Sequence, residues 1–166
     1  NAVGKSSILS LDLKTLEYKP TKKVVFDTIE TVKKIENITE RFLLLIKGED
    51  KAGEFYRRNF GSMFAYIQNR VPEICDEIYK VDDALKAGYG WQFGPFEIWN
   101  SIGLEEGVNL LKSLGHKPSQ WINDMLQNNI DSFYSIENNK TTFYDLKSKK
   151  FKIKPGQESF IVLKNL

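Results

Sequence analysis

Residues 81–103 of the chain read VDDALKAGYGWQFGPFEIWNSIG, and this stretch decides how the centre of the sequence folds. Residues 82–87 favour a helix that is predicted to stop at Gly88, because glycine readily adopts the left-handed conformation found at helix C-termini. Pro95 stands where a first-turn proline would, a position at which the missing N–H breaks no hydrogen bond. The stretch therefore predicts two helices joined by a tight, glycine-rich turn.

Helix start and stop residues continue on both sides of this stretch, so the middle of the chain is predicted to be helical. Asp27 and Glu30 have the spacing of an N-cap and its N3 partner. Asp50 precedes apolar residues that recur at three- and four-residue spacing, which is typical of the buried face of a helix. Gly48 is expected to stop a helix, and Pro72 to kink or restart one. The expected helices cover residues 27–36, 39–47, 50–67, 72–87, 96–102, 104–114 and 118–126.

Alternating and β-branched patterns predict short strands at both ends of the chain. They cover residues 8–13, 16–18, 133–136, 141–144, 151–153 and 159–163. The two ends also resemble each other, because DLKT at 12–15 with Tyr18-Lys19 matches DLKS at 145–148 with Phe151-Lys152 at the same spacing. Two interpretations stay open: two hairpins with similar turn chemistry, or one small sheet that both ends build against the helices.

The sequence thus predicts a mainly α fold, a multi-helix domain with small β-hairpins at both ends. The expected divisions are a β-like N-terminal segment (1–25), a helical domain (26–130) and a β-rich C-terminal segment (131–166). Asn1 and Ala2 look like the remainder of an expression tag, and a chain without an initial Met is consistent with a piece of a larger protein.

Composition narrows the classes of function. The chain has 166 residues, a net charge of +2 and 41% hydrophobic residues, which fits one folded domain and argues against a disordered or polycationic nucleic-acid-binding protein. The longest apolar run, Phe42–Ile46, is far shorter than the ~20 residues of a membrane span, and no signal-peptide pattern is present. We expect a cytoplasmic protein with no nucleic-acid partner and no membrane span.

Few residues could support catalysis or bind a metal. A single cysteine, Cys75, excludes an internal disulfide framework and a Cys-based zinc cluster, and it is expected to be a small buried side chain. The single histidine, His116, is expected in a surface loop. Residues 88–94 spell G-x-G-x-x-x-G, but a dinucleotide fingerprint needs a strand before it. We expect these glycines to close one helix and turn into the next.

Aromatic residues are concentrated in one part of the chain. Eleven of the 21 lie between Phe55 and Trp99. Such a concentration is typical either of a densely packed core or of a groove that binds a ligand or another domain. Both interpretations stay open from the composition.

Residues 81–91 and 94–103 resemble the signature of the C-terminal helical domain of 3-hydroxyacyl-CoA dehydrogenases, roughly (I/V)D-x-A-(M/L)-x-x-G-x-G followed by GPFE-x-x-D-x-x-G. The upstream helix, with Asn59-Phe60 and Glu73-Ile74, fits the same domain. Residues 121–134 fit larger bacterial members, in which the helical domain is repeated. The chain resembles the second copy, together with the segment that leads towards an enoyl-CoA hydratase-like region.

The resemblance implies a parent enzyme of fatty-acid β-oxidation that passes hydride from a 3-hydroxyacyl-CoA to NAD. In that family the His–Glu base pair and the phosphate-binding glycine turn lie in a Rossmann domain, and neither is present here. The chain is therefore expected to be non-catalytic, to bind no cofactor or metal itself, and to help enclose acyl-CoA and assemble domains. The expected partners are the Rossmann domain, the hydratase-like region, acyl-CoA and a homodimer partner.

The resemblance also suggests particular residues. Asn59 stands near the place of a substrate-side Asn, although the spacing is shorter than in the family, and Asn100 stands where the family usually has Asp. The remaining candidates are an interface at Gly94, Pro95, Phe96 and Trp99. For Phe96 and Trp99 the alternative is that both fill the local core. The alternative function is an independent helical protein-interaction module that lost the enzyme activity.

Overall fold

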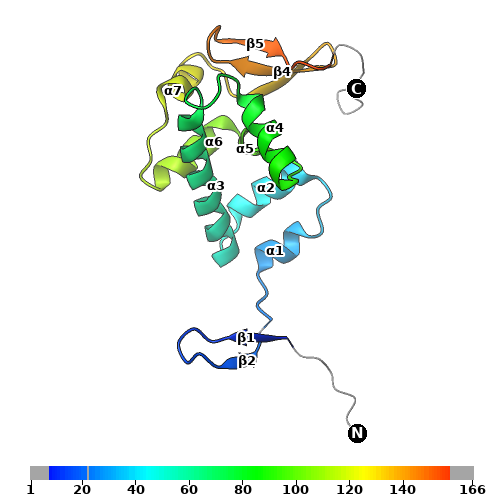
Figure 1. Ribbon diagram of the computed structural model, residues 1–166, viewed down its shortest axis with the longest axis vertical. Coiled ribbons are helices and arrows are strands. Elements are labelled where there is room, and N and C mark those ends of the chain that lie inside the picture. The colour runs from blue at the N-terminus through cyan, green and yellow to red at the C-terminus, as the bar shows by residue number, and fades with distance from the viewer. Residues whose placement is uncertain (1–7, 22, 158–166) are drawn as a thin grey trace.

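The computed structural model describes residues 8–21 and 23–157, which form a helical body with a small antiparallel sheet at each end (Figure 1). The helices are α1 (Asp27–Val32), α2 (Ile38–Lys47), α3 (Lys51–Arg70), α4 (Ile78–Tyr89), α5 (Pro95–Ile102), α6 (Leu104–Ser113) and α7 (Gln120–Gln127). The first sheet pairs β1 (Leu9–Leu11) with β2 (Tyr18–Pro20). The second has the order β3 (Tyr134–Glu137), β4 (Lys140–Asp145), β5 (Lys150–Ile153).

This architecture confirms the predicted mainly α fold with small β-hairpins. The two ends build separate sheets, so the alternative of one shared sheet is wrong. Figure 1 shows why: the three-stranded sheet covers one end of the helical body, and the β1–β2 hairpin stands off the opposite end. The strand expected at 159–163 lies outside the described residues. Within the described residues, no helix is both long and apolar enough to cross a membrane.

The N-termini of α1 and α3 are capped by the same side chain, which is local in sequence for α3 and distant for α1. The Asp50 carboxylate accepts hydrogen bonds from Ala52 N and Gly53 N, which confirms the predicted cap of α3. The predicted Asp27 cap of α1 is wrong, because Asp27 is already the first helical residue. Asp50 instead accepts the Thr28 N–H at 3.0 Å, so one carboxylate serves the first turns of two helices.

Four further helix boundaries differ from the sequence prediction. Helix α3 ends at Arg70 and no helix restarts at Pro72, because a residue before proline is driven towards extended backbone, as Val71 is (ψ 118°). Helix α4 passes through Gly88 and ends at Gly90, which has the left-handed φ of +67°. Helix α1 ends at Val32, short of residue 36. Helix α7 begins two residues after Pro118.

The core is centred on Trp99, a residue of α5 with no exposed surface. Its ring stacks on Phe64 of α3 with centroids 4.6 Å apart, and Phe133 meets it edge-on at 5.1 Å. The indole Nε1 donates to Leu104 O at 3.1 Å, so the buried N–H is paired. Gly107 makes this packing possible, because a Cβ there would lie 1.9 Å from the indole nitrogen. Part of the aromatic concentration is therefore core.

Because Trp99 is fully enclosed, replacing it by alanine should remove a large part of the stability of the fold. We expect Trp99→Ala to cost about 3–5 kcal/mol in the free energy of unfolding. Trp91, which is 42% exposed, provides the matched control, and Trp91→Ala should cost less than about 1 kcal/mol. Urea unfolding of both variants measures the difference, and equal losses would contradict a core centred on Trp99.

Candidate functional site

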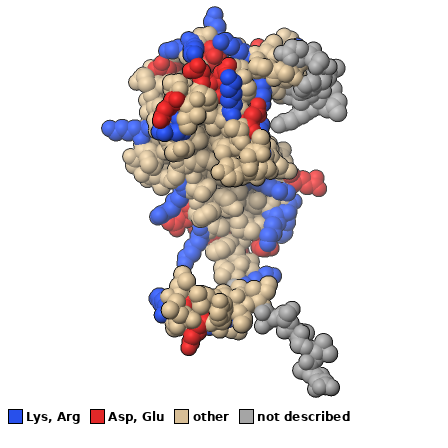
Figure 2. All heavy atoms as spheres, viewed as in Figure 1, with Lys and Arg blue, Asp and Glu red and all other residues tan. Residues whose placement is uncertain are grey.

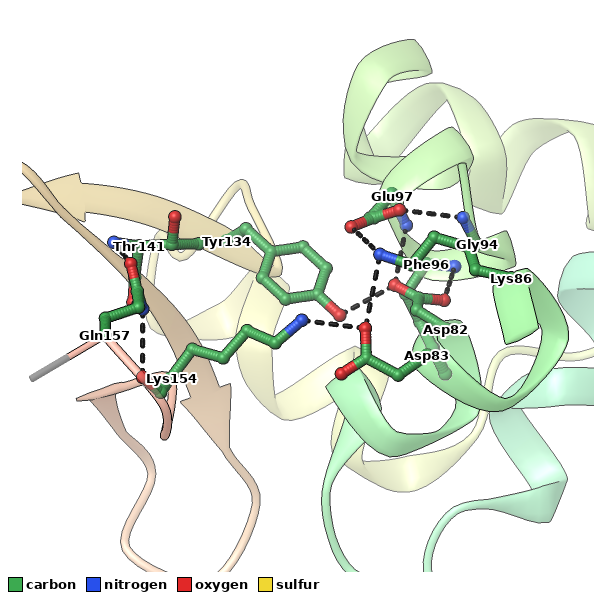
Figure 3. Close-up of polar contacts among 10 residues, drawn as sticks. All are labelled: Asp82, Asp83, Lys86, Gly94, Phe96, Glu97, Tyr134, Thr141, Lys154 and Gln157. Carbon is green, nitrogen blue, oxygen red and sulfur yellow. Dashed lines mark hydrogen bonds and ion pairs between the residues drawn. The ribbon is translucent and has the colours of Figure 1, made fainter. Parts of the chain in front are cut away.

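Several residues of the 81–103 stretch meet around one buried carboxyl group, that of Asp82. Asp82 lies on α4 and is 1% exposed. Its Oδ1 accepts from Phe96 N at 2.8 Å, and its Oδ2 accepts from Glu97 N at 3.1 Å and from the Tyr134 hydroxyl at 2.7 Å. Figure 3 shows these three donors converging from α5 and the start of β3. One side chain thus joins α4, α5 and the sheet.

Together with this carboxyl, the Gly-Pro-Phe-Glu segment satisfies the whole first turn of α5. Gly94 N donates to Glu97 Oε2 at 2.8 Å, and Pro95 has no N–H to satisfy. The positive end of the helix dipole also favours a carboxylate at this place. Gly94 must be glycine, because a Cβ there would lie 2.3 Å from the Asp82 Cβ. The Asp and Gly-Pro-Phe-Glu parts of the motif therefore form a single helix cap shared between two helices.

A layer of charged groups covers this cap and ties the sheet to the helices. Lys86 Nζ lies 2.7 Å from Glu97 Oε1 and 3.2 Å from Asp83 Oδ1. On the sheet side, Lys154 Nζ lies 2.8 Å from the same Asp83 oxygen. Glu97 thus acts twice, as a cap for Gly94 and as a partner for Lys86.

Asn100 supplies the other link between α5 and the sheet. Its Oδ1 accepts from Phe133 N at 2.7 Å and from Tyr134 N at 3.1 Å, at the start of β3. Both bonds use the oxygen of the side chain, and a carboxylate of the same length could accept them. This explains in physical terms how Asn can stand where the resembling family usually has Asp.

Burial is the largest influence on the pKa values of the titratable groups around the shared cap. Burial raises the pKa of Asp82 to about 7, against the opposing effect of the hydrogen bonds from Tyr134 and Phe96, and the nearby negative charge of Glu97 raises it further. Burial and the adjacent Asp82 carboxyl also raise the pKa of Tyr134 well above its ordinary value. For Lys86, burial works in the opposite direction, but Glu97 and Asp83 raise its pKa overall.

A raised pKa in a closed interior indicates a positioning role rather than acid–base catalysis. Asp82 has almost no surface that a substrate could reach, and its oxygens are already occupied by protein donors. His116 is exposed in the loop after α6, as predicted. Cys75 lies half-buried in the turn before α4, its Sγ 3.5 Å from Glu77 O. Neither side chain joins Asp82 in a reactive arrangement.

The glycines of the 88–94 segment lie between two helices and not after a strand. Gly88 belongs to α4, Gly90 ends that helix and Gly94 begins the next. This confirms their interpretation as a helix-to-helix turn, although the stop is at Gly90 rather than Gly88. Over residues 8–21 and 23–157, no group of three or more His, Cys, Asp or Glu side chains is placed to hold a metal ion.

Asn59 lies on the rim of an apolar groove, which we call the α2–α3 groove. The groove has a volume of about 390 Å³ and is lined by Ile38, Phe42, Leu45, Tyr56, Asn59, Phe60, Met63, Trp91, Gln92, Phe93 and Ile98. Phe42 packs edge-on against Phe60 and Phe93, with ring centroids 5.9 and 5.6 Å apart. The second part of the aromatic concentration therefore lines a surface groove. That this groove binds a ligand or another domain stays a prediction.

The four residues expected at an interface lie inside the domain. Phe96 and Trp99 have no exposed surface, and Gly94 and Pro95 are buried beside them. Phe96 meets Phe133 edge-on at 5.2 Å. These side chains fill the core, the alternative stated for Phe96 and Trp99, and they present no surface of their own to a partner.

The protein is thus a helical domain in which the shared cap at Asp82 holds α4, α5 and the three-stranded sheet together. Sequence comparison shows which proteins resemble it. The chain is 33% identical over 139 residues, 84% of its length, to a Bacillus subtilis protein named "Probable 3-hydroxyacyl-CoA dehydrogenase". It is 32% identical over 66 residues to a Rickettsia felis protein and 31% identical over 67 residues to a Rickettsia prowazekii protein, or 35% and 40% of its length. Both Rickettsia proteins carry the name of a fatty acid oxidation complex trifunctional enzyme.

The chain spans only 18% of the length of the Bacillus relative and 9% of each Rickettsia relative. No protein-family model matches the sequence, and no solved structure gives a significant match. The resemblance to 3-hydroxyacyl-CoA dehydrogenases is confirmed by these relatives, over a part of their length.

The shared cap should make Asp82 far more important for stability than the carboxylate next to it. We expect Asp82→Ala to lower the free energy of unfolding by about 2–4 kcal/mol, because Phe96 N, Glu97 N and the Tyr134 hydroxyl lose their acceptor together. Asp83→Ala, which removes only partly exposed ion pairs, should cost at most about 1 kcal/mol. Urea unfolding of the pair measures this, and a loss at Asp83 as large as that at Asp82 would contradict the shared cap.

The raised pKa of Asp82 predicts how stability depends on pH. Its pKa is about 7 in the folded protein and 3.8 in an ordinary environment, so the folded state binds this proton more tightly than the unfolded chain does. The contribution of Asp82 to stability should therefore be complete below pH 4 and fall as the pH rises to about 7. Asp145 behaves in the opposite way: although burial alone would raise its pKa, Lys152 and Ser148 hold it at about 2, so its contribution is lost only on acidification below pH 4.

Asp82→Asn separates the two effects, because the amide does not titrate. Urea unfolding between pH 4 and 7 should show a decline in wild-type stability, relative to the variant, of at most about 1.4 kcal/mol per pH unit. All other titratable groups are common to the two proteins, so the difference between the curves reports on residue 82. Parallel curves would show that Asp82 is ionised throughout this range.

Proposed function

We propose that this chain is a helical part of a longer NAD-dependent 3-hydroxyacyl-CoA dehydrogenase of fatty-acid β-oxidation. In this proposal it is the second copy of the C-terminal helical domain, and it helps to enclose acyl-CoA and to assemble the neighbouring domains. The observation that carries the proposal is the 33% identity over 84% of the chain to a relative with that name, of which the chain spans 18%. The shared cap at Asp82 gives the matching motif its physical basis.

The N-terminus of α5 does not fit the pyrophosphate of NAD, and this supports a non-catalytic role for the chain. A dinucleotide pyrophosphate needs free N–H groups at a helix N-terminus after a glycine turn. At α5, the candidate suggested by the glycines, Phe96 N and Glu97 N are taken by the Asp82 carboxyl, and Gly94 N is taken by Glu97. Carboxyl groups there exclude a phosphate. In the proposal, NAD and the general base belong to another domain, such as a Rossmann domain.

The α2–α3 groove is the surface that best suits an acyl substrate. Its lining is mostly aliphatic and aromatic, and its volume of about 390 Å³ lies within the usual range of ligand pockets. Each methylene of an acyl chain that leaves water there would contribute about 0.8 kcal/mol. The amide of Asn59 lies on the rim, where it can hydrogen-bond a carbonyl or hydroxyl oxygen of the substrate. This placement agrees with the substrate-side role suggested for Asn59.

The proposal is tested on the full-length polypeptide that contains this chain. We expect it to reduce NAD when supplied with a 3-hydroxyacyl-CoA, while the 166-residue chain alone shows no turnover under the same conditions. The absorbance of NADH measures both reactions. If the full-length polypeptide is inactive towards 3-hydroxyacyl-CoA, the proposal fails and an independent helical interaction module becomes the better hypothesis.

The role of Asn59 has its own test in the same full-length protein. Asn59→Ala should lower kcat/KM about tenfold, the effect of losing one hydrogen bond of about 1.4 kcal/mol to the substrate. Asn69→Ala is the matched control, because Asn69 is an exposed amide on the same helix but lies outside the groove. Equal activity of the two variants would remove Asn59 from the substrate side.

A further inference from the structure

The β1–β2 hairpin is built in the same way as the β4–β5 hairpin at the other end of the chain. Leu11 pairs with Tyr18 in the first hairpin, and Tyr144 pairs with Phe151 in the second, at the equivalent place in the repeated sequence. The residue after Leu11 and the residue after Tyr144 are both aspartates, Asp12 and Asp145. Lys19 Nζ lies 2.7 Å from Asp12 Oδ2, and Lys152 Nζ lies 2.8 Å from Asp145 Oδ2.

The two turns also agree in backbone detail. Leu16 has φ +57° and donates its N–H to Asp12 O at 2.7 Å, and Lys149 has φ +53° and donates to Asp145 O at 2.8 Å. Positive φ is uncommon for residues other than glycine, so its recurrence at one position of both turns is specific. The likeness of the two ends is thus a repeated structural unit and extends beyond similar turn composition.

The two hairpins differ in what covers them. In the C-terminal hairpin, β4 pairs with β3 along its second edge, Tyr144 is 2% exposed, and Phe143 packs on Tyr79 of α4 with ring centroids 4.8 Å apart. In the N-terminal hairpin, Leu11, the equivalent of Tyr144, is 42% exposed. Within the described residues, the second edge of β1 pairs with no strand. Figure 2 shows this hairpin standing off the helical body.

The bare hairpin has one distinctly apolar face. Cross-strand pairing places Leu9 and Leu11 beside Pro20 and Tyr18 on that face, while the intervening Ser10–Lys19 pair points to the other side. A two-stranded hairpin is marginally stable in water by itself, and it gains stability from a third strand or from a helix packed on its apolar face. The C-terminal unit of this chain has both.

We infer that the apolar face of the β1–β2 hairpin docks on a helical domain built like residues 78–153 of this chain, supplied by the part of a longer polypeptide that precedes residue 8. The inference rests on the proposed function only because it requires a longer polypeptide. The Bacillus relative is such a protein, since the match covers only 18% of its length. A second copy of this chain is a poorer partner, because its equivalent surface on α4 is already covered by its own β4.

Hydrogen exchange tests the docking directly. The 166-residue chain is compared with a protein extended upstream by one domain length of native sequence, about 100–150 residues. The amides of β1 and β2 should exchange at least about 100-fold more slowly in the extended protein. Docking raises the free energy of local opening, which is near zero for a fraying hairpin. Amides of β4, which are covered in both proteins, serve as the internal reference.

Two substitutions on one strand test which face is buried. Leu11→Asp, on the apolar face, should lower the Tm of the extended protein and leave that of the 166-residue chain unchanged. Ser10→Asp, on the opposite face, should change neither, since it adds the same charge one residue away.

Each contrary result overturns the inference. Unchanged exchange in the extended protein, or equal effects of the two variants, would show that no domain covers the hairpin. Dimerisation of the 166-residue chain that Leu11→Asp abolishes would identify a second copy as the partner instead. A native reading frame that begins near Ser6 would leave no preceding domain. Dehydrogenase activity of the full-length protein is measured separately, so loss of the docking model does not decide the proposed function.

Discussion

The structure depends on one carboxyl group that is shared by three elements. Asp82 takes the first-turn N–H groups of α5 and the hydroxyl of Tyr134, and so fixes α5 and the sheet to α4 at one point. Helix α5 in turn carries Trp99, around which α3, α6 and the start of the sheet pack. An eight-residue helix has little stability of its own. Its place is therefore set by the cap and the core together.

A buried carboxyl is a costly way to cap a helix, and its raised pKa records that cost. An apolar side chain at 82 would avoid the free-energy cost of burying a carboxyl group. It would, however, leave three donors in or near the interior without this acceptor, which is worse. The glycine at 94 is required by the close approach of Asp82, and Glu97 completes the cap from inside α5. The residues of the motif depend on one another, so they form a recognisable unit in the sequence.

The sequence predicted those features that arise from neighbouring residues, such as the Asp50 cap, the Gly48 stop, the Pro95 start and both hairpins. It did not predict features made across the fold. Asp82 caps a helix that begins 13 residues later in the chain, and nothing local distinguishes it from Asp83 next to it. Likewise, the Thr28 N–H donates to the carboxylate of the distant Asp50, and Asp27, predicted as the cap, is the first residue of the helix. The aromatic count left a core and a groove open as alternatives and could not assign each ring to one of them.

The cap also connects stability with the proposed function. Trp91 and Phe93, which line the α2–α3 groove, lie in the short turn between Gly90 and Gly94. One end of this turn is held by the bond from Gly90 N to Lys86 O, and the other by Gly94 N on Glu97 beside Asp82. The same bonds that fill the N-terminus of α5, and so exclude a phosphate from it, hold two aromatic side chains in the groove wall. The helix end whose N–H groups are already bonded thereby shapes the apolar wall of the groove, and in the proposed function the chemistry lies in another domain.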